Sequence, residues 1–89
     1  MIKEYTFISD IGHAWLKVPF TDLIALGIEN DISAYSYHKE GMAYLEEDCD
    51  AYRFIKASQK VGNTIRFKEL TVNRESKIRT YNSYSNLLV

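Results

Sequence analysis

The chain has 89 residues, a single cysteine and a formal net charge of -1, and 46% of its residues are hydrophobic. This length and composition predict one folded domain with a modest core, and exclude a disordered chain or an internal disulfide. No apolar stretch approaches the ~20 residues of a membrane helix, and no signal-peptide pattern opens the chain. We therefore expect a cytoplasmic protein that does not cross a membrane.

The first part of the chain predicts a ββα unit over residues 5–28. Alternating aromatic residues indicate a strand, and the Asp and Gly within residues 9–13 favour a turn before a returning strand at 14–18. Pro19 suits the first turn of a helix, because its missing N–H is not needed there, and Gly27 is a typical end.

A second ββα unit is predicted over residues 32–62. Residues 32–38 alternate in the manner of a strand, and residues 42–47 form the returning strand. We expect Asp48 or Asp50 to cap the helix that follows, since a carboxylate accepts hydrogen bonds from the free amides of the first turn.

The two units share a motif of Gly, any residue, Ala, aromatic residue and Leu, at residues 12–16 and again at 41–45. We interpret this as an internal repeat, with both units in one antiparallel sheet and two short helices on one face. Residues 64–81 predict a C-terminal hairpin and residues 82–89 a tail. The fold class is then α+β, in the order ββαββαββ. We expect the apolar end at 87–89 to dock on this sheet or on a second copy in a homodimer.

Charge divides the chain in two. Residues 1–50 carry a net charge of -7 and residues 51–89 a net charge of +6. This asymmetry is compatible with an acidic face for a basic partner, a basic face for nucleic acid, head-to-tail self-association, or a fold that interleaves the charges and cancels them.

An acidic cluster follows the second predicted hairpin, and tyrosines lie close to it in the sequence. Clustered carboxylates repel one another, so we favour a partner-binding role over a solvated edge. The segment has neither the glycine nor the alternating ligands of a calcium loop, and we expect no metal or cofactor. The candidate partner-binding residues are Glu46, Glu47, Asp48, Asp50, Tyr35, Tyr37 and Tyr44.

Basic residues gather in the last two predicted strands, with Phe67, Tyr81 and Tyr84 among them. Sheets bind single-stranded nucleic acid through such basic strands with interleaved aromatic residues, although the pI near 6.1 disfavours this function. The alternative nucleic-acid-binding residues are Arg66, Lys68, Arg74, Lys77 and Arg79.

Catalytic motifs are missing from the sequence. No glycine-rich phosphate loop, nucleophile elbow or paired-histidine metal motif is present. The spacing of His13, His38 and Cys49 does not indicate a nucleophile and its base, and we expect Cys49 to be a half-buried, unreactive thiol. We do not expect an enzyme.

Four motifs resemble a group of short, mostly uncharacterised proteins carried by bacteria, plasmids and prophages. The motifs are Asp10-x-Gly12-His13-x-Trp15-Leu16, Leu26-Gly27-Ile28, Ile32-Ser33-x-Tyr35-Ser36-Tyr37 and Tyr44-Leu45-Glu46-Glu47-Asp48-Cys49-Asp50. The likeness covers residues 5–55 and implies no established activity. By format alone, the chain is also similar to phage inhibitors of bacterial defence, including anti-CRISPR proteins. Those inhibitors often present carboxylates in place of phosphates, and this second likeness transfers no site residues.

We therefore expect a non-enzymatic protein-binding inhibitor or accessory factor of a phage or mobile element, in a bacterial cytoplasm. Its acidic surface would engage a basic, nucleic-acid-binding groove on a host protein. The alternatives are a small nucleic-acid-binding module that uses the basic C-terminal strands, and a small self-associating structural protein.

Overall fold

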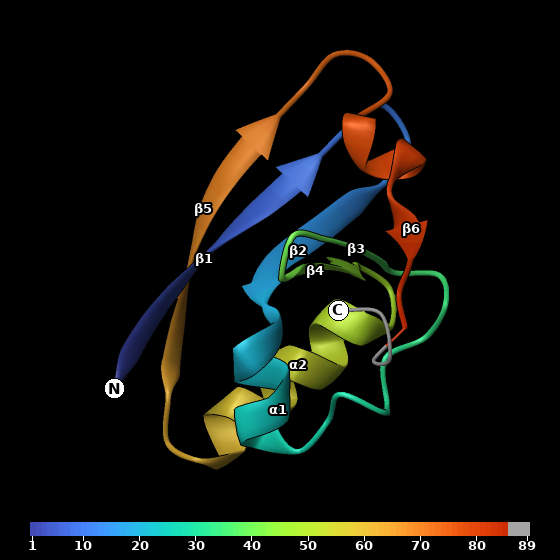
Figure 1. Ribbon diagram of the computed structural model, residues 1–89. Helices are drawn as coiled ribbons and strands as arrows, with labels where there is room; N and C mark the ends of the chain where they lie inside the picture. The colour runs from blue at the N-terminus through green and yellow to red at the C-terminus, as the bar shows by residue number, and fades with distance from the viewer. Residues whose placement is uncertain (86–89) are drawn as a thin grey trace.

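The computed structural model describes residues 1–85 and combines one sheet with two α-helices (Figure 1). The elements are β1 (Ile2–Ser9), β2 (Ala14–Pro19), α1 (Phe20–Leu26), β3 (Tyr37–Lys39), β4 (Met42–Glu46), α2 (Asp50–Lys60), β5 (Thr64–Thr71), the 3-10 helix η1 (Lys77–Thr80) and β6 (Asn82–Ser83). The strand order is β5-β1-β2-β4-β3-β6. The α+β class is confirmed, but the sheet is mixed rather than antiparallel, because β5 runs parallel to β1.

The two predicted hairpins lie side by side in the middle of the sheet. Strands β2 and β4 are antiparallel neighbours, flanked by β1 and β3, and each leads to a helix. Leu16 lies opposite Leu45, and these are equivalent residues of the two matching motifs. The aromatic members of the motifs, Trp15 and Tyr44, pack together in a different cluster, as expected for the alternate face of a strand. Both ββα units therefore form in the predicted order.

Both helices cover the same face of the sheet, as expected. Leu23 of α1 and Phe54 of α2 are fully buried there against Leu16 and Leu45. The Tyr5 ring meets Phe54 edge-on with centroids 5.1 Å apart. Each such large side chain stabilises the fold by about 1.5–3 kcal/mol through removal of apolar surface from water.

The opposite face of the sheet, hereafter the outer face, is covered at its centre by η1. Ile78 of η1 is buried against Trp15 and Tyr44. Trp15 is only 2% exposed, so this small second cluster shields the middle of the sheet from solvent on its second side. The helix η1 is thus a structural layer of its own.

The predicted C-terminal hairpin over residues 64–81 is wrong. Strand β5 instead pairs with β1 along its whole length, from Ile2 opposite Thr64 to Ser9 opposite Thr71. The chain then crosses the outer face as η1, and β6 pairs with β3 at the far edge of the sheet. β1 provides backbone hydrogen-bonding partners along the whole of β5. The segment predicted to return as a second strand instead forms η1, which buries Ile78 over the sheet.

The strand predicted over residues 32–38 begins only at Tyr37. Ser33 and Ser36 turn the chain, because the Ser36 N–H bonds the Ser33 carbonyl at 3.3 Å. Both hydroxyls donate to the carboxylate of Asp50, at 2.6 Å from Ser33 and 2.5 Å from Ser36, and the Ser33 N–H also donates to it. These bonds are incompatible with an extended strand.

The predicted helix cap is also wrong. Cys49 occupies the N-cap position of α2 without a side-chain hydrogen bond to the helix. Asp50 is fully buried and turned toward the two serines, whereas Asp48 is exposed. Cys49 is exposed rather than half-buried, because β4 ends at Glu46 and no longer holds it on a strand face.

The apolar segment at 87–89, with its expected docking, lies outside the described residues. Within residues 1–85, none of the helices combines the length and apolar character needed to cross a membrane.

We expect Asp50→Ala to lower the free energy of unfolding by about 2–4 kcal/mol, because it leaves the buried hydroxyl of Ser36 and the half-buried donors of Ser33 without their acceptor. Urea denaturation measures this value. The matched control is Asp48→Ala in the same acidic cluster, for which we expect a change within about 0.5 kcal/mol, since Asp48 is exposed. Equal losses from the two variants would contradict this assignment.

Candidate functional site

A buried carboxylate attaches η1 to the turn between β1 and β2. Asp10 accepts hydrogen bonds from Arg79 Nε at 2.6 Å and Nη2 at 3.0 Å, and from the Ser76 N–H at 2.9 Å. It also accepts from the N–H groups of Gly12 and His13 in its own turn. The Asp10 side chain is fully buried and Arg79 is 28% exposed. The Arg79 guanidinium, helped by these N–H groups, holds the pKa of Asp10 well below its usual range.

The same contacts fix where Arg79 lies. Its guanidinium carbon is 5.8 Å from the centre of the Trp15 ring. A Cβ at Gly12 would lie 3.3 Å from Arg79 Nη2, so glycine allows this close approach. Arg79 lines a hollow on one side of η1, and Lys77 lines a separate hollow elsewhere on the outer face. The attachment of η1 therefore shapes both.

The first hollow, which we name the acidic pocket, has a volume of about 260 Å³. Tyr35 and Tyr37 supply accessible aromatic surface to it, and the nearly buried Trp15 ring borders it, meeting Tyr37 edge-on at 6.2 Å. Tyr35 is 82% exposed and forms an outer wall. Glu46 and Asp48 complete the lining on the acidic side. Aromatic rings and carboxylates attract the same kind of ligand, a cation.

The charge balance of the acidic pocket also favours a cation. The Glu46 carboxylate accepts hydrogen bonds from the Asp48 N–H at 2.6 and 3.1 Å, which folds the loop after β4 and brings both acids to one pocket. Arg79 lies in the lining too, but its charge is paired with Asp10. Two carboxylates thus remain without an ion pair among the residues that the structure describes.

Four of the seven predicted partner-binding residues line this pocket, namely Tyr35, Tyr37, Glu46 and Asp48. Glu47 is exposed next to them in the chain. The other two residues need correction, since both are buried and neither lines this pocket. Asp50 is fully buried and bonded to two serines, and Tyr44 packs on Tyr81 at 5.1 Å and lines a separate hollow of the outer face.

Three lining residues are not among the predicted partner-binding residues, namely His13, Trp15 and Arg79. The first two lie in the motif that carries the resemblance, so that motif is a usable signal. Arg79 is predicted for the nucleic-acid face instead, and no local pattern links it to this pocket, because its partner Asp10 is 69 residues away in the chain.

The second hollow, which we name the basic groove, has a volume of about 340 Å³. Arg74 and Lys77, two of the predicted nucleic-acid-binding residues, line it together with Lys17. Arg66 and Lys68 lie nearby on β5 and are exposed.

Two predictions about the nucleic-acid face need correction. Arg79 lines the acidic pocket rather than the basic groove, and its charge is already paired with Asp10. Tyr84 is buried in the core on the helix side, where its hydroxyl donates to the Glu29 carbonyl at 2.6 Å. Burial, with nearby carboxylates, raises the pKa of Tyr84 to about 12.

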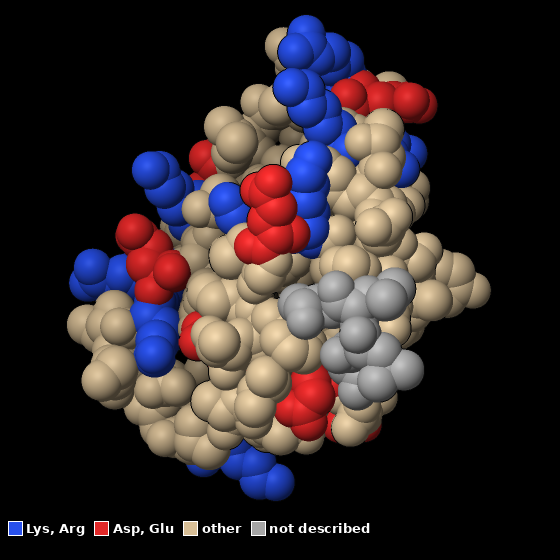
Figure 2. All heavy atoms as spheres, in the orientation of Figure 1, with Lys and Arg blue, Asp and Glu red and all other residues tan. Residues whose placement is uncertain are grey.

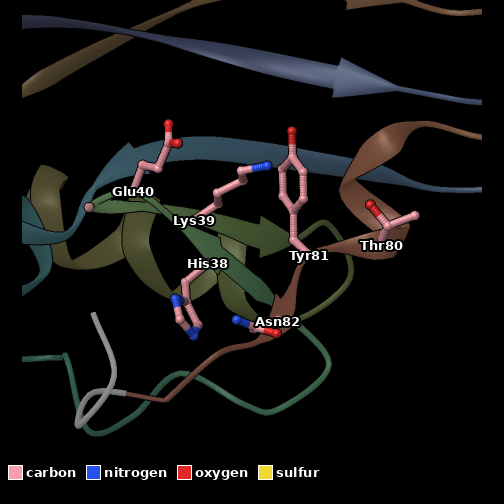
Figure 3. Close-up of a pocket in the computed structure, with 7 residues that line it drawn as sticks. His38, Lys39, Glu40, Thr80, Tyr81 and Asn82 are labelled. Atoms are coloured by element: carbon pink, nitrogen blue, oxygen red, sulfur yellow. The ribbon is translucent and has the colours of Figure 1, made fainter.

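A third hollow of about 410 Å³ surrounds the turn between β3 and β4 (Figure 3). The Lys39 ammonium lies 4.8 Å from the centre of the Tyr81 ring. His38 points to the other side of the strand, toward Asn82, and its Nε2 has no hydrogen-bond partner within residues 1–85. The polar side chains around this hollow therefore do not converge on one point.

Comparison of the chain with protein-family models, curated proteins and solved structures gave no match. Among the described residues, no three His, Cys, Asp or Glu side chains are grouped so as to hold a metal ion. The proposals below therefore depend on the geometry of the acidic pocket and the basic groove.

The Asp10 attachment predicts a pH-dependent stability. A carboxyl group with a depressed folded-state pKa stabilises the fold above its unfolded pKa, near 4, and this contribution is lost as the pH falls below that value. We therefore expect Asp10→Asn to be less stable than the native chain at about pH 7, with the difference shrinking below about pH 5.

Urea denaturation of both proteins at about pH 7, 5 and 3 measures this difference. Asp31→Asn, which changes an exposed loop carboxylate, is the matched control and should show no such trend. A stability difference between Asp10→Asn and the native chain that is constant with pH would contradict the role of Asp10.

Proposed function

We propose that this chain is a protein-binding inhibitor or accessory factor of a phage or mobile element, which acts on a basic, nucleic-acid-binding host protein. The observation that carries the proposal is the acidic pocket, where three aromatic side chains and two carboxylates converge. The resemblance of residues 5–55 to short proteins of plasmids and prophages supports a mobile-element origin. The acidic first half of the chain is compatible with a surface that replaces phosphates on its target.

In this proposal, a lysine or arginine side chain of the partner enters the acidic pocket. Its charge meets the carboxylates of Glu46 and Asp48, and its stem and cationic head contact the aromatic rings. A cation–π contact contributes about 0.5–2 kcal/mol, and an exposed ion pair adds up to about 1 kcal/mol. Tyr35 is the expected anchor, because it is 82% exposed in the free protein and a partner in the pocket would cover it.

Reversing the charges of the acidic pocket and of the adjacent Glu47 should abolish partner capture. We expect the native chain, immobilised on a resin, to retain a basic protein from a nuclease-treated bacterial lysate. A variant with Glu46→Lys, Glu47→Lys and Asp48→Lys should lose that protein, because its pocket repels cations. Mass spectrometry of the retained protein identifies the partner.

The matched control reverses three other exposed acids, Glu4, Asp31 and Glu69, to Lys. This control has the same change in net charge and should still retain the partner. Loss of the partner with both variants would show that only net charge matters, and would overturn the acidic pocket as the binding site.

Trp15 is the only tryptophan of the chain and lies at the pocket, so its fluorescence reports occupancy directly. We expect a short arginine-rich peptide to change this fluorescence, and Tyr35→Ala to weaken its binding about fivefold, equivalent to about 1 kcal/mol. The control is Tyr52→Ala on α2, which removes an exposed tyrosine distant in the chain. An equal effect from both substitutions would contradict the predicted contact.

A further inference from the structure

We propose that the basic groove binds single-stranded nucleic acid. This site is separate from the acidic pocket, and none of the described residues lines both hollows. The inference goes beyond the proposed function, because the chain would bind single-stranded nucleic acid itself in addition to a host protein.

The floor of the basic groove is apolar. Ile8 of β1, Leu70 of β5 and Ile78 of η1 line it, and Leu70 is 52% exposed. Tyr81 adds an aromatic wall. Such a floor accepts the flat, weakly polar face of a nucleobase, which a site built only from charges would not favour.

The rim of the groove is basic. Lys17, Arg74 and Lys77 come from three different segments, and none of them forms an ion pair within residues 1–85. Among residues 1–85, Glu75 is the only acidic residue in the lining. Three cations against one carboxylate, around an apolar floor, match a ligand that carries phosphate next to an apolar ring.

The cations continue beyond the groove along β5. Thr6 pairs with Lys17 on one side and with Lys68 on the other, so these two lysines share a row across β2, β1 and β5. Arg66 lies two residues before Lys68 on the same face of its strand. Figure 2 shows blue atoms where β5 leads into η1 at the upper end of the molecule, and along the left side, with some red atoms among them. An extended row of cations fits a polyanion better than a single small anion.

An acidic peptide is the competing ligand. Its carboxylates would satisfy the rim, but it supplies no flat ring at each repeat for the apolar floor and Tyr81. A nucleic-acid strand has a phosphate and a base in every unit, and both parts of the groove are then used. The observations therefore favour the nucleic acid.

The test measures fluorescence anisotropy of a labelled oligothymidylate of about 12 nucleotides with the full chain. We expect binding that weakens as salt rises from about 50 to 200 mM. The variant Lys17→Gln, Arg74→Gln and Lys77→Gln should bind at least about tenfold more weakly, and the slope of log K against log salt should fall by about 2, since each phosphate contact contributes about 0.7.

The matched control removes one arginine and two lysines elsewhere, with Arg53→Gln, Lys56→Gln and Lys60→Gln on the exposed side of α2. It should bind the oligonucleotide as the native chain does. Urea denaturation, followed by Trp15 fluorescence, verifies that each variant is folded. A native chain that does not bind the oligonucleotide, or an equal loss in both variants, would overturn the inference. Binding of a polyglutamate peptide without binding of the oligonucleotide would assign the groove to acidic protein segments instead.

Discussion

The Asp10 carboxylate is the interaction on which the outer face of this protein depends. It joins a turn near the start of the chain to a helix close to its end, and it does so with five N–H donors and no exposed surface of its own. Each of these donors offsets part of the cost of burying the carboxylate. The turn, η1 and the guanidinium of Arg79 therefore stabilise one another, and with them the walls of both hollows.

Hairpins and helices could be predicted from the sequence, because each depends on residues close together in the chain. The first hairpin and α1 follow from alternating aromatic residues, a turn with Asp and Gly, and Pro19 before the helix. The position of β5 could not be predicted in this way, since alternation marks a strand but does not select its neighbour. Ala34 and Ser36 alternate with Tyr35 and Tyr37 as in a strand, and only a distant acceptor, Asp50, explains why Ser33 and Ser36 turn the chain.

The candidate site was predictable to the same extent. Glu46 and Asp48 are near Tyr37 because β3 and β4 are joined by a tight turn, and a sequence pattern detects such a hairpin. Trp15 and Arg79 come from elsewhere in the chain, so only the tertiary structure brings them to the pocket. The hairpin predicted for the basic residues does not form, yet Arg74 and Lys77 lie together in the basic groove, because the chain after β5 turns back over Ile8 and Leu70. The charge asymmetry of the sequence thus becomes two hollows of opposite character on the outer face.

The open edge of β5 has a consequence for self-association. Consider a second copy that pairs its own β5 antiparallel to this edge, so that the two sheets continue with their outer faces on the same side. Even-numbered residues of β5 then lie opposite even-numbered residues, and odd-numbered residues opposite odd-numbered ones. With Phe67 on the twofold axis, Arg66 faces Lys68; with Arg66 or Lys68 on the axis, that residue faces its own copy. Like charges directly opposite each other are destabilising in every one of these registers. The basic residues of β5 therefore disfavour pairing of this exposed edge with the same edge of a second copy in these registers.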